Sequence, residues 1–79
     1  MKENVIMDRA FDAACLEAKG ETEWANQIIT RLKSTNPEYI EWIDNLVGFY
    51  TTMVTSNTDF LVRADYMIEN RNKLRLRFK

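Results

Sequence analysis

The chain has 79 residues, of which 46% are hydrophobic and 29% are charged, and its formal net charge is −1. This length allows one domain with a thin core, and this hydrophobic content excludes a disordered chain. Histidine is absent and Cys15 is the only cysteine, so an intrachain disulfide and a transition-metal site of usual composition are excluded. We therefore expect no metal and no cofactor, and we expect so small a domain to gain stability by self-association.

Four helices are predicted in a single domain, residues 1–72. The first runs from about residue 4 to residue 19 and ends at Gly20, a residue that commonly terminates helices. Cys15 lies among its alanines and is expected to be a small buried side chain rather than a reactive thiol. One stripe of this helix is apolar and small enough for close helix packing: Met7, Ala10, Phe11, Ala14 and Ala18.

The second predicted helix starts at Thr22, which we expect to be its N-cap, and ends in residues 34–36. Its apolar stripe contains Trp24, which we interpret, like Tyr66 further on, as a partly buried core aromatic rather than a binding anchor. Asn36 is then expected to cap the third helix, because Pro37 and Glu38 suit a first helical turn.

The third predicted helix has an apolar face that covers half of its circumference, whereas a globular surface helix needs a stripe little wider than 100°. We therefore expect it to be the central element, in contact with two neighbours or with a second chain. Tyr39, Trp42 and Phe49 lie toward different edges of this face, so they are candidate partner-binding residues. The alternative is that a small domain needs all of them for its own core.

The fourth predicted helix follows a turn and cap at residues 56–58 and ends near Arg71. Residues 73–79 then form a basic C-terminal arm with the sequence KLRLRFK, in which apolar and basic side chains alternate. An extended strand accommodates this alternation, and we favour it over continuation of the helix, which would place Leu76 on the wrong face. The fold class is therefore all-α: a small four-helix domain with a short extended basic C-terminal strand or arm.

A single strand has no sheet to join within its own chain, so it needs a partner for its backbone hydrogen bonds. We expect that partner to be the same segment of a second copy or the sheet edge of another protein. The remaining alternative is a solvated tail kept soluble by its charges. The arm adds five candidate partner-binding residues: Leu74, Arg75, Leu76, Arg77 and Phe78.

Charge is divided unevenly along the chain. Residues 1–70 carry a net charge of −6, and the last nine residues carry +5. The basic end can dock on an acidic body, or it can bind phosphates weakly and without sequence preference. A helix-turn-helix reading of the turn before Pro37 fails, because the third helix begins with Glu38, Glu41 and Asp44, which repel phosphate.

Catalysis is not expected, because the chain has no histidine that could act as a general base or activate Cys15, and it has no phosphate-binding or nucleophile motif. We expect a cytoplasmic, non-catalytic protein-interaction module that acts as a homodimer or higher oligomer, with no membrane segment. Compact, motif-poor chains of this size are typical of phage and mobile-element proteins that inhibit or adapt host machinery in the host cytoplasm. The alternatives are a nucleic-acid-binding accessory protein that uses the basic arm, and an oligomer that binds a small anionic ligand through Arg71, Arg75 or Arg77.

Overall fold

The structure, a computed structural model, describes the backbone of residues 2–77 and the side chains of residues 2–73. Over this range the protein is a small all-α domain of four helices, as predicted. The helices are α1 (Lys2–Ala18), α2 (Thr22–Thr35), α3 (Ile40–Ser56) and α4 (Val62–Arg77). Two short 3-10 helices, η1 (Pro37–Tyr39) and η2 (Thr58–Leu61), precede α3 and α4.

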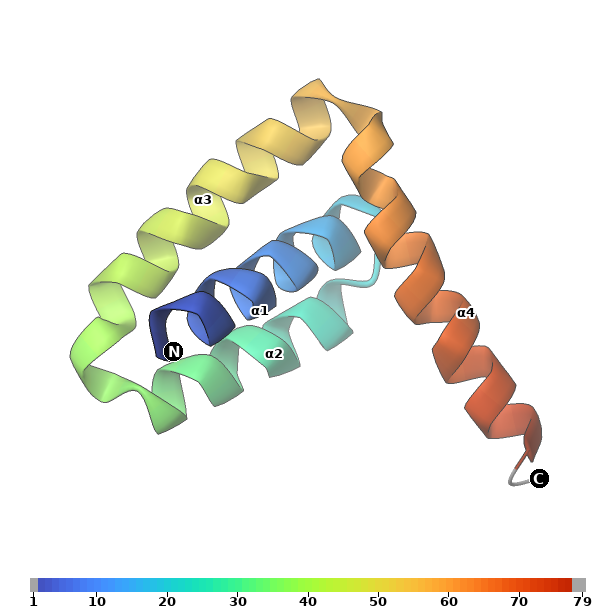
Figure 1. Ribbon diagram of the computed structural model, residues 1–79, viewed down its shortest axis with the longest axis horizontal. Coiled ribbons are helices and arrows are strands. Elements are labelled where there is room, and N and C mark those ends of the chain that lie inside the picture. The colour runs from blue at the N-terminus through green and yellow to red at the C-terminus, as the bar shows by residue number, and fades with distance from the viewer. Residues whose placement is uncertain (1, 78–79) are drawn as a thin grey trace.

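The central element is α1, and the expectation that the third helix would be central is wrong. Figure 1 shows α1 between α2 and α3, with α4 crossing near the C-terminal end of α1 and extending away from the other helices. Residues 12–16 are all buried, which requires neighbours on every side of the helix. Alanine gives α1 this position, because Ala10, Ala13 and Ala14 are fully buried and let the flanking helices approach closely.

Two clusters of buried side chains hold the helices together. The first joins the C-terminal half of α1 to α2, α3 and α4, and the second lies near the N-terminus of α1, where Ile6 meets Leu32 and Ile43. Burial of a side chain such as Leu16 stabilises the fold by about 1.5–3 kcal/mol. The first cluster consists of Ala13, Cys15, Leu16, Ala25, Val54 and Ala64.

The helix ends confirm some of the sequence predictions and correct others. Gly20 ends α1 with a φ of +88°, and the Glu21 and Gly20 N–H groups donate to the carbonyls of Leu16 and Glu17 over 2.9 and 3.0 Å. These two bonds form a Schellman motif, which favours glycine because of its positive φ. Asn57 provides a cap within the predicted residues 56–58, since its side-chain oxygen accepts from the Asp59 N–H over 3.1 Å, but it caps η2, which precedes α4.

Two predicted caps are wrong. Glu21, not Thr22, occupies the N-cap position of α2, and it makes no side-chain capping bond. Asn36 precedes η1, but its amide donates backward to the Leu32 carbonyl over 3.0 Å and so closes α2 instead of capping α3. The physical reason is that η1 lies between Asn36 and α3, so α3 begins one turn later than expected.

The described part of the basic arm, residues 73–77, is helical and continues α4, whereas the sequence favoured an extended conformation. A helix satisfies its backbone donors and acceptors within the chain, whereas a strand would need a second strand. Phe78 and Lys79 lie outside the described residues. No helix in the described part of the chain has the length and hydropathy needed to cross a bilayer.

Candidate interaction surface

The apolar half of α3 is only partly covered by the rest of the domain. Ile43 and Val54 face the core and are fully buried, while Phe49 is 63% exposed on one edge and Ile40 is exposed on the other. The wide apolar face therefore exceeds what α1 and its neighbours can cover. Four half-buried side chains lie on the helix surface between the buried residues and Phe49: Trp42, Leu46, Tyr50 and Met53.

The three candidate residues of the third helix have different surroundings. The Tyr39 hydroxyl donates to Glu3 over 3.3 Å, and the Tyr39 ring packs against Trp42 with centroids 5.6 Å apart. Both rings also pack against the Ile6 cluster, so they support the contact between α1 and α3. Phe49 has the most exposed side chain of the three, and it is the one best placed to contact a partner.

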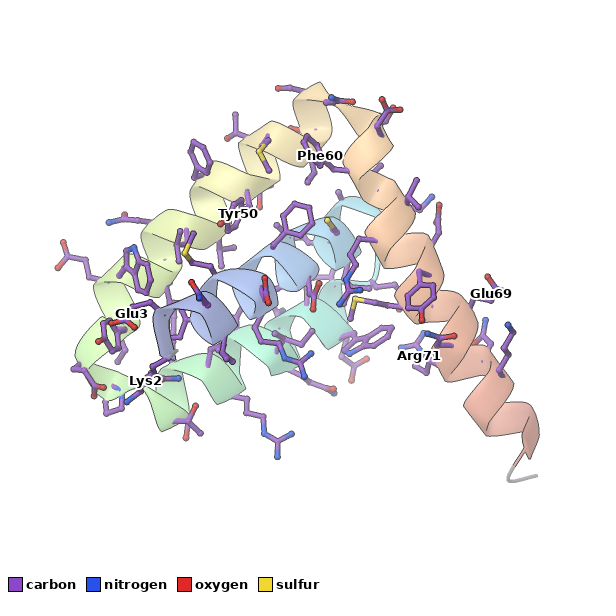
Figure 2. All side chains as sticks on the ribbon, in the orientation of Figure 1. Lys2, Glu3, Tyr50, Phe60, Glu69 and Arg71 are labelled. Atoms are coloured by element: carbon purple, nitrogen blue, oxygen red, sulfur yellow. The ribbon has the colours of Figure 1, made fainter. Side chains whose placement is uncertain are left out.

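Phe49 belongs to a series of aromatic rings that crosses the domain. Successive centroids lie 5.7 Å apart from Phe49 to Tyr50, 5.4 Å from Tyr50 to Phe11, and 5.9 Å from Phe11 to Phe60, all in edge-to-face arrangements. Figure 2 labels Tyr50 on α3 and Phe60 just before α4. Edge-to-face pairs each add about 0.5–1.5 kcal/mol beyond area burial, so the exposed Phe49 ring is held against the half-buried Tyr50 ring.

A buried carboxylate attaches α4 to the central helix. Asp12 of α1 is 3% exposed, and its Oδ1 accepts from the Nε of Arg63 over 2.9 Å, while Arg9 lies 3.8 Å from its other oxygen. The carboxylate raises the pKa of Arg63 through this hydrogen bond and its charge. Sequence reasoning missed Asp12, although its isolated charge in the stretch FDAACL, residues 11–16, was a signal for a buried ionic contact.

Arg71 is held by the body of the domain. Its guanidinium lies 4.3 Å from the centroid of the Trp24 ring and 3.3 Å from a Glu21 carboxylate oxygen. These contacts dock α4 on α2 through the ring face and one terminal nitrogen of the guanidinium, while the buried Nε of Arg71 has no hydrogen-bond partner among the described residues. The candidates Leu74, Arg75, Leu76 and Arg77 lie on the last turn of α4, beyond the described side chains, and Phe78 lies outside the described residues.

A groove of about 370 Å³ lies between α1 and α2 and reaches Met67 of α4. Its charged lining residues are Arg9 and Arg31, and Val5 and Ile28 contribute apolar surface. The groove therefore offers a mixed basic and apolar surface, but Arg9 already lies beside Asp12. Among the described residues, no group of three or more Cys, Asp or Glu side chains is placed to hold a metal ion.

Cys15 has the buried position that the sequence predicts. Its side chain is fully buried, and its thiol donates to the Phe60 carbonyl over 3.5 Å. Burial raises the pKa of the Cys15 thiol from its ordinary 9.0 to about 11, with a smaller contribution from the nearby charge of Asp12. The side chain is therefore a neutral thiol at neutral pH, and this chemistry does not favour a nucleophilic role.

Comparison with known proteins adds no relative. No protein-family model, no curated protein and no solved structure matches the chain.

Proposed function

We propose that this protein is a non-catalytic protein-interaction module that acts as a homo-oligomer. The observation that carries the proposal is the exposed edge of α3, where the Phe49 ring packs on the half-buried Tyr50 ring yet remains open to solvent. Aromatic side chains and methionine are enriched in the cores of protein interfaces, and rigidly held rings lose little conformational entropy on binding. The neutral, buried Cys15 and the absence of histidine support a binding role over catalysis.

The projecting end of α4 is our candidate contact for a second protein. Residues 71–79 carry five basic and no acidic side chains. Arg71 is docked on the body, and α4 continues from it to Arg77, away from the other helices (Figure 1). An acidic surface on a host protein fits this charge, so we propose an inhibitor or adaptor of host machinery, such as a phage or mobile element would encode. The cytoplasm is the compartment that this role requires.

Nucleic-acid binding is the alternative use of the same end of α4. A helix that projects from the body can approach a phosphate backbone without bringing the acidic residues of the body with it (Figure 1). Binding of this kind weakens steeply as salt rises, because it depends on counterion release. Binding to an acidic protein surface that also uses Leu74 and Leu76 would lose less affinity with salt.

The first test is the native mass of the full chain beside a version that ends at Asn72, measured by light scattering across a concentration series. We expect the full chain to have a multiple of its 9.4 kDa monomer mass. A full chain that stays monomeric up to about 1 mM would contradict the homo-oligomer, since any self-association would then be weaker than about 4 kcal/mol. Retardation of duplex DNA at low salt only, abolished by truncation, would favour the alternative.

A further inference from the structure

From Asn45 to its end at Ser56, α3 carries no charge on any side. Residues 45–58 contain no Asp, Glu, Lys or Arg, although 29% of the chain is charged. A solvent-facing helix usually carries charged residues on its outer face. The outer surface of this uncharged stretch, which we call the uncharged face, can therefore lose water without burying a charge. It consists of Asn45, Gly48, Phe49, Thr52, Thr55 and Ser56, all exposed.

The hydroxyl groups on and beside this face are satisfied by the helix itself. Thr52 donates to the Gly48 carbonyl over 3.1 Å, Thr55 to the Thr51 carbonyl over 2.9 Å, and Ser56 to the Thr52 carbonyl over 2.9 Å. A buried hydroxyl without a hydrogen-bond partner costs about 1–3 kcal/mol. Because these hydroxyls already have partners, a protein surface can cover them without that cost.

Gly48 has no explanation within a single copy of the chain. It lies in the middle of α3 without a positive φ, and nothing lies within 4 Å of the position that a Cβ would occupy. Glycine in a helix interior costs about 1 kcal/mol relative to alanine. A close approach of a second backbone at this point accounts for the glycine, as at helix–helix contacts that small residues permit.

We propose that the uncharged face of α3 is the contact between two copies of this chain, with the two α3 helices antiparallel across a two-fold axis near Phe49. This inference rests on the proposed function and names the surface and the partner of the homo-oligomer. A two-fold contact places each side chain against its own kind or a close neighbour, so a surface without charge suits it. A charged partner would leave its own charges unmatched on this face.

The antiparallel orientation of the two α3 helices follows from the charges that flank the uncharged face. Glu38, Glu41 and Asp44 all lie toward the N-terminal end of α3, and no charged residue follows until Asp59. Parallel helices would bring the two acidic ends together, whereas antiparallel helices place each acidic end beside the uncharged end of the other copy. Figure 1 shows α3 at the outer edge of the molecule, where a second helix can reach it.

The test compares dimer dissociation constants, by light scattering or analytical ultracentrifugation, for the full chain and three variants. Phe49→Glu and Gly48→Arg place charge on the face, and each should raise the dissociation constant at least about 100-fold. Tyr66 is 57% exposed on α4, not partly buried as predicted, so Tyr66→Glu changes a similarly exposed aromatic and should leave the constant unchanged. Circular dichroism should show an unchanged helix content in all three, because neither Gly48 nor Phe49 is buried.

Cysteine cross-linking tests the direction of the helices. In an antiparallel pair centred near Phe49, Asn45→Cys chains should cross-link to Thr52→Cys chains but not to themselves, since like positions lie about 10 Å apart along the axis at 1.5 Å per residue. Self-linking of each variant alone would overturn the antiparallel arrangement. Cys15 is buried and does not compete under mild oxidation.

The outcomes separate the inference from the proposed function. If the full chain is a dimer and both charged variants remain dimers, the α3 contact is wrong while the homo-oligomer stands. If the full chain never self-associates, both fail. A dissociation constant that changes less than about twofold between 0.05 and 0.5 M salt supports the uncharged face, whereas a steep salt dependence assigns the dimer to the basic end of α4 and overturns the inference.

Discussion

At the scale of single residues, three buried polar side chains have defined partners, whereas the buried Nε of Arg71 has none in the described part of the chain. Asp12 binds Arg63, the Asn36 amide binds the Leu32 carbonyl, and the Cys15 thiol donates to the Phe60 carbonyl. Cys15 is the one whose chemistry can be followed directly. Its environment favours the neutral thiol, because burial opposes formation of the thiolate.

We predict that a thiol reagent at pH 8 labels Cys15 in the native protein at least about 100 times more slowly than in urea-unfolded protein, because only the exposed thiolate reacts. The pKa of the thiol is about 11 when folded and 9.0 ordinarily, so the folded state binds more protons between these values. This residue's contribution to stability is therefore complete below pH 9 and is lost as pH rises toward 11. Urea titrations at pH 8 and pH 10 measure this loss.

The control for that measurement is Cys15→Ala, which should lose less stability than the parent between pH 8 and pH 10. Equal losses in the two proteins would show that Cys15 is not the source of the pH dependence. Fast labelling of the native protein would show that the end of α1 opens readily.

At the scale of elements, the sequence predicts all four helices because each has an apolar stripe, but it predicts their ends less well. Gly20 and Asn57 mark ends correctly, since positive φ and a short capping side chain are local requirements. Thr22 and Asn36 do not cap as expected, because the choice between competing hydrogen bonds depends on the neighbouring turn. The sequence alone did not show that α4 continues through residues 73–77. The alternative was a strand, and a strand needs a partner that a single sequence does not identify.

Substitution of the two glycines by alanine should change the free energy of unfolding in opposite directions. Gly20→Ala should destabilise the protein by about 1 kcal/mol, because alanine is strained at a φ of +88°. Gly48→Ala should stabilise the monomer by about 0.5–1 kcal/mol, because its surroundings are open and alanine is the better helix former. Urea denaturation at a protein concentration that keeps the chain monomeric measures both changes, and changes of the same sign would contradict this account.

At the scale of the whole molecule, α4 is attached differently from the other helices. α1, α2 and α3 share apolar contacts along their lengths, whereas α4 contributes Ala64, Met67 and Ile68 to one end of the core. Ion pairs supply much of its remaining attachment: Asp12 with Arg63, Lys19 with Asp65, and Glu21 with Arg71. The sequence predicts the helices but not how they pack. The apolar stripe of a helix shows which side is buried, but it does not show which other helix covers that side.

We predict that α4 opens before the other three helices. Hydrogen exchange followed by mass spectrometry should show amides of residues 62–73 exchanging at least about 10 times faster than those of residues 6–16. Raising the salt from 0.05 to 1 M should widen this difference, because partly exposed ion pairs are screened. Uniform exchange across all four helices would show instead that the domain opens as one unit.

The central position of α1 has a consequence for synthesis of the protein on the ribosome. The helix that the other three contact is also the first to be made, so each later helix emerges when its docking surface already exists. The hairpin of α1 and α2 can form first, α3 can then cover the opposite side of α1, and α4 is added last. Each later helix can pack on α1 as soon as it is made. Apart from the apolar surface of α1, a nascent chain therefore exposes little unpartnered apolar surface at any stage.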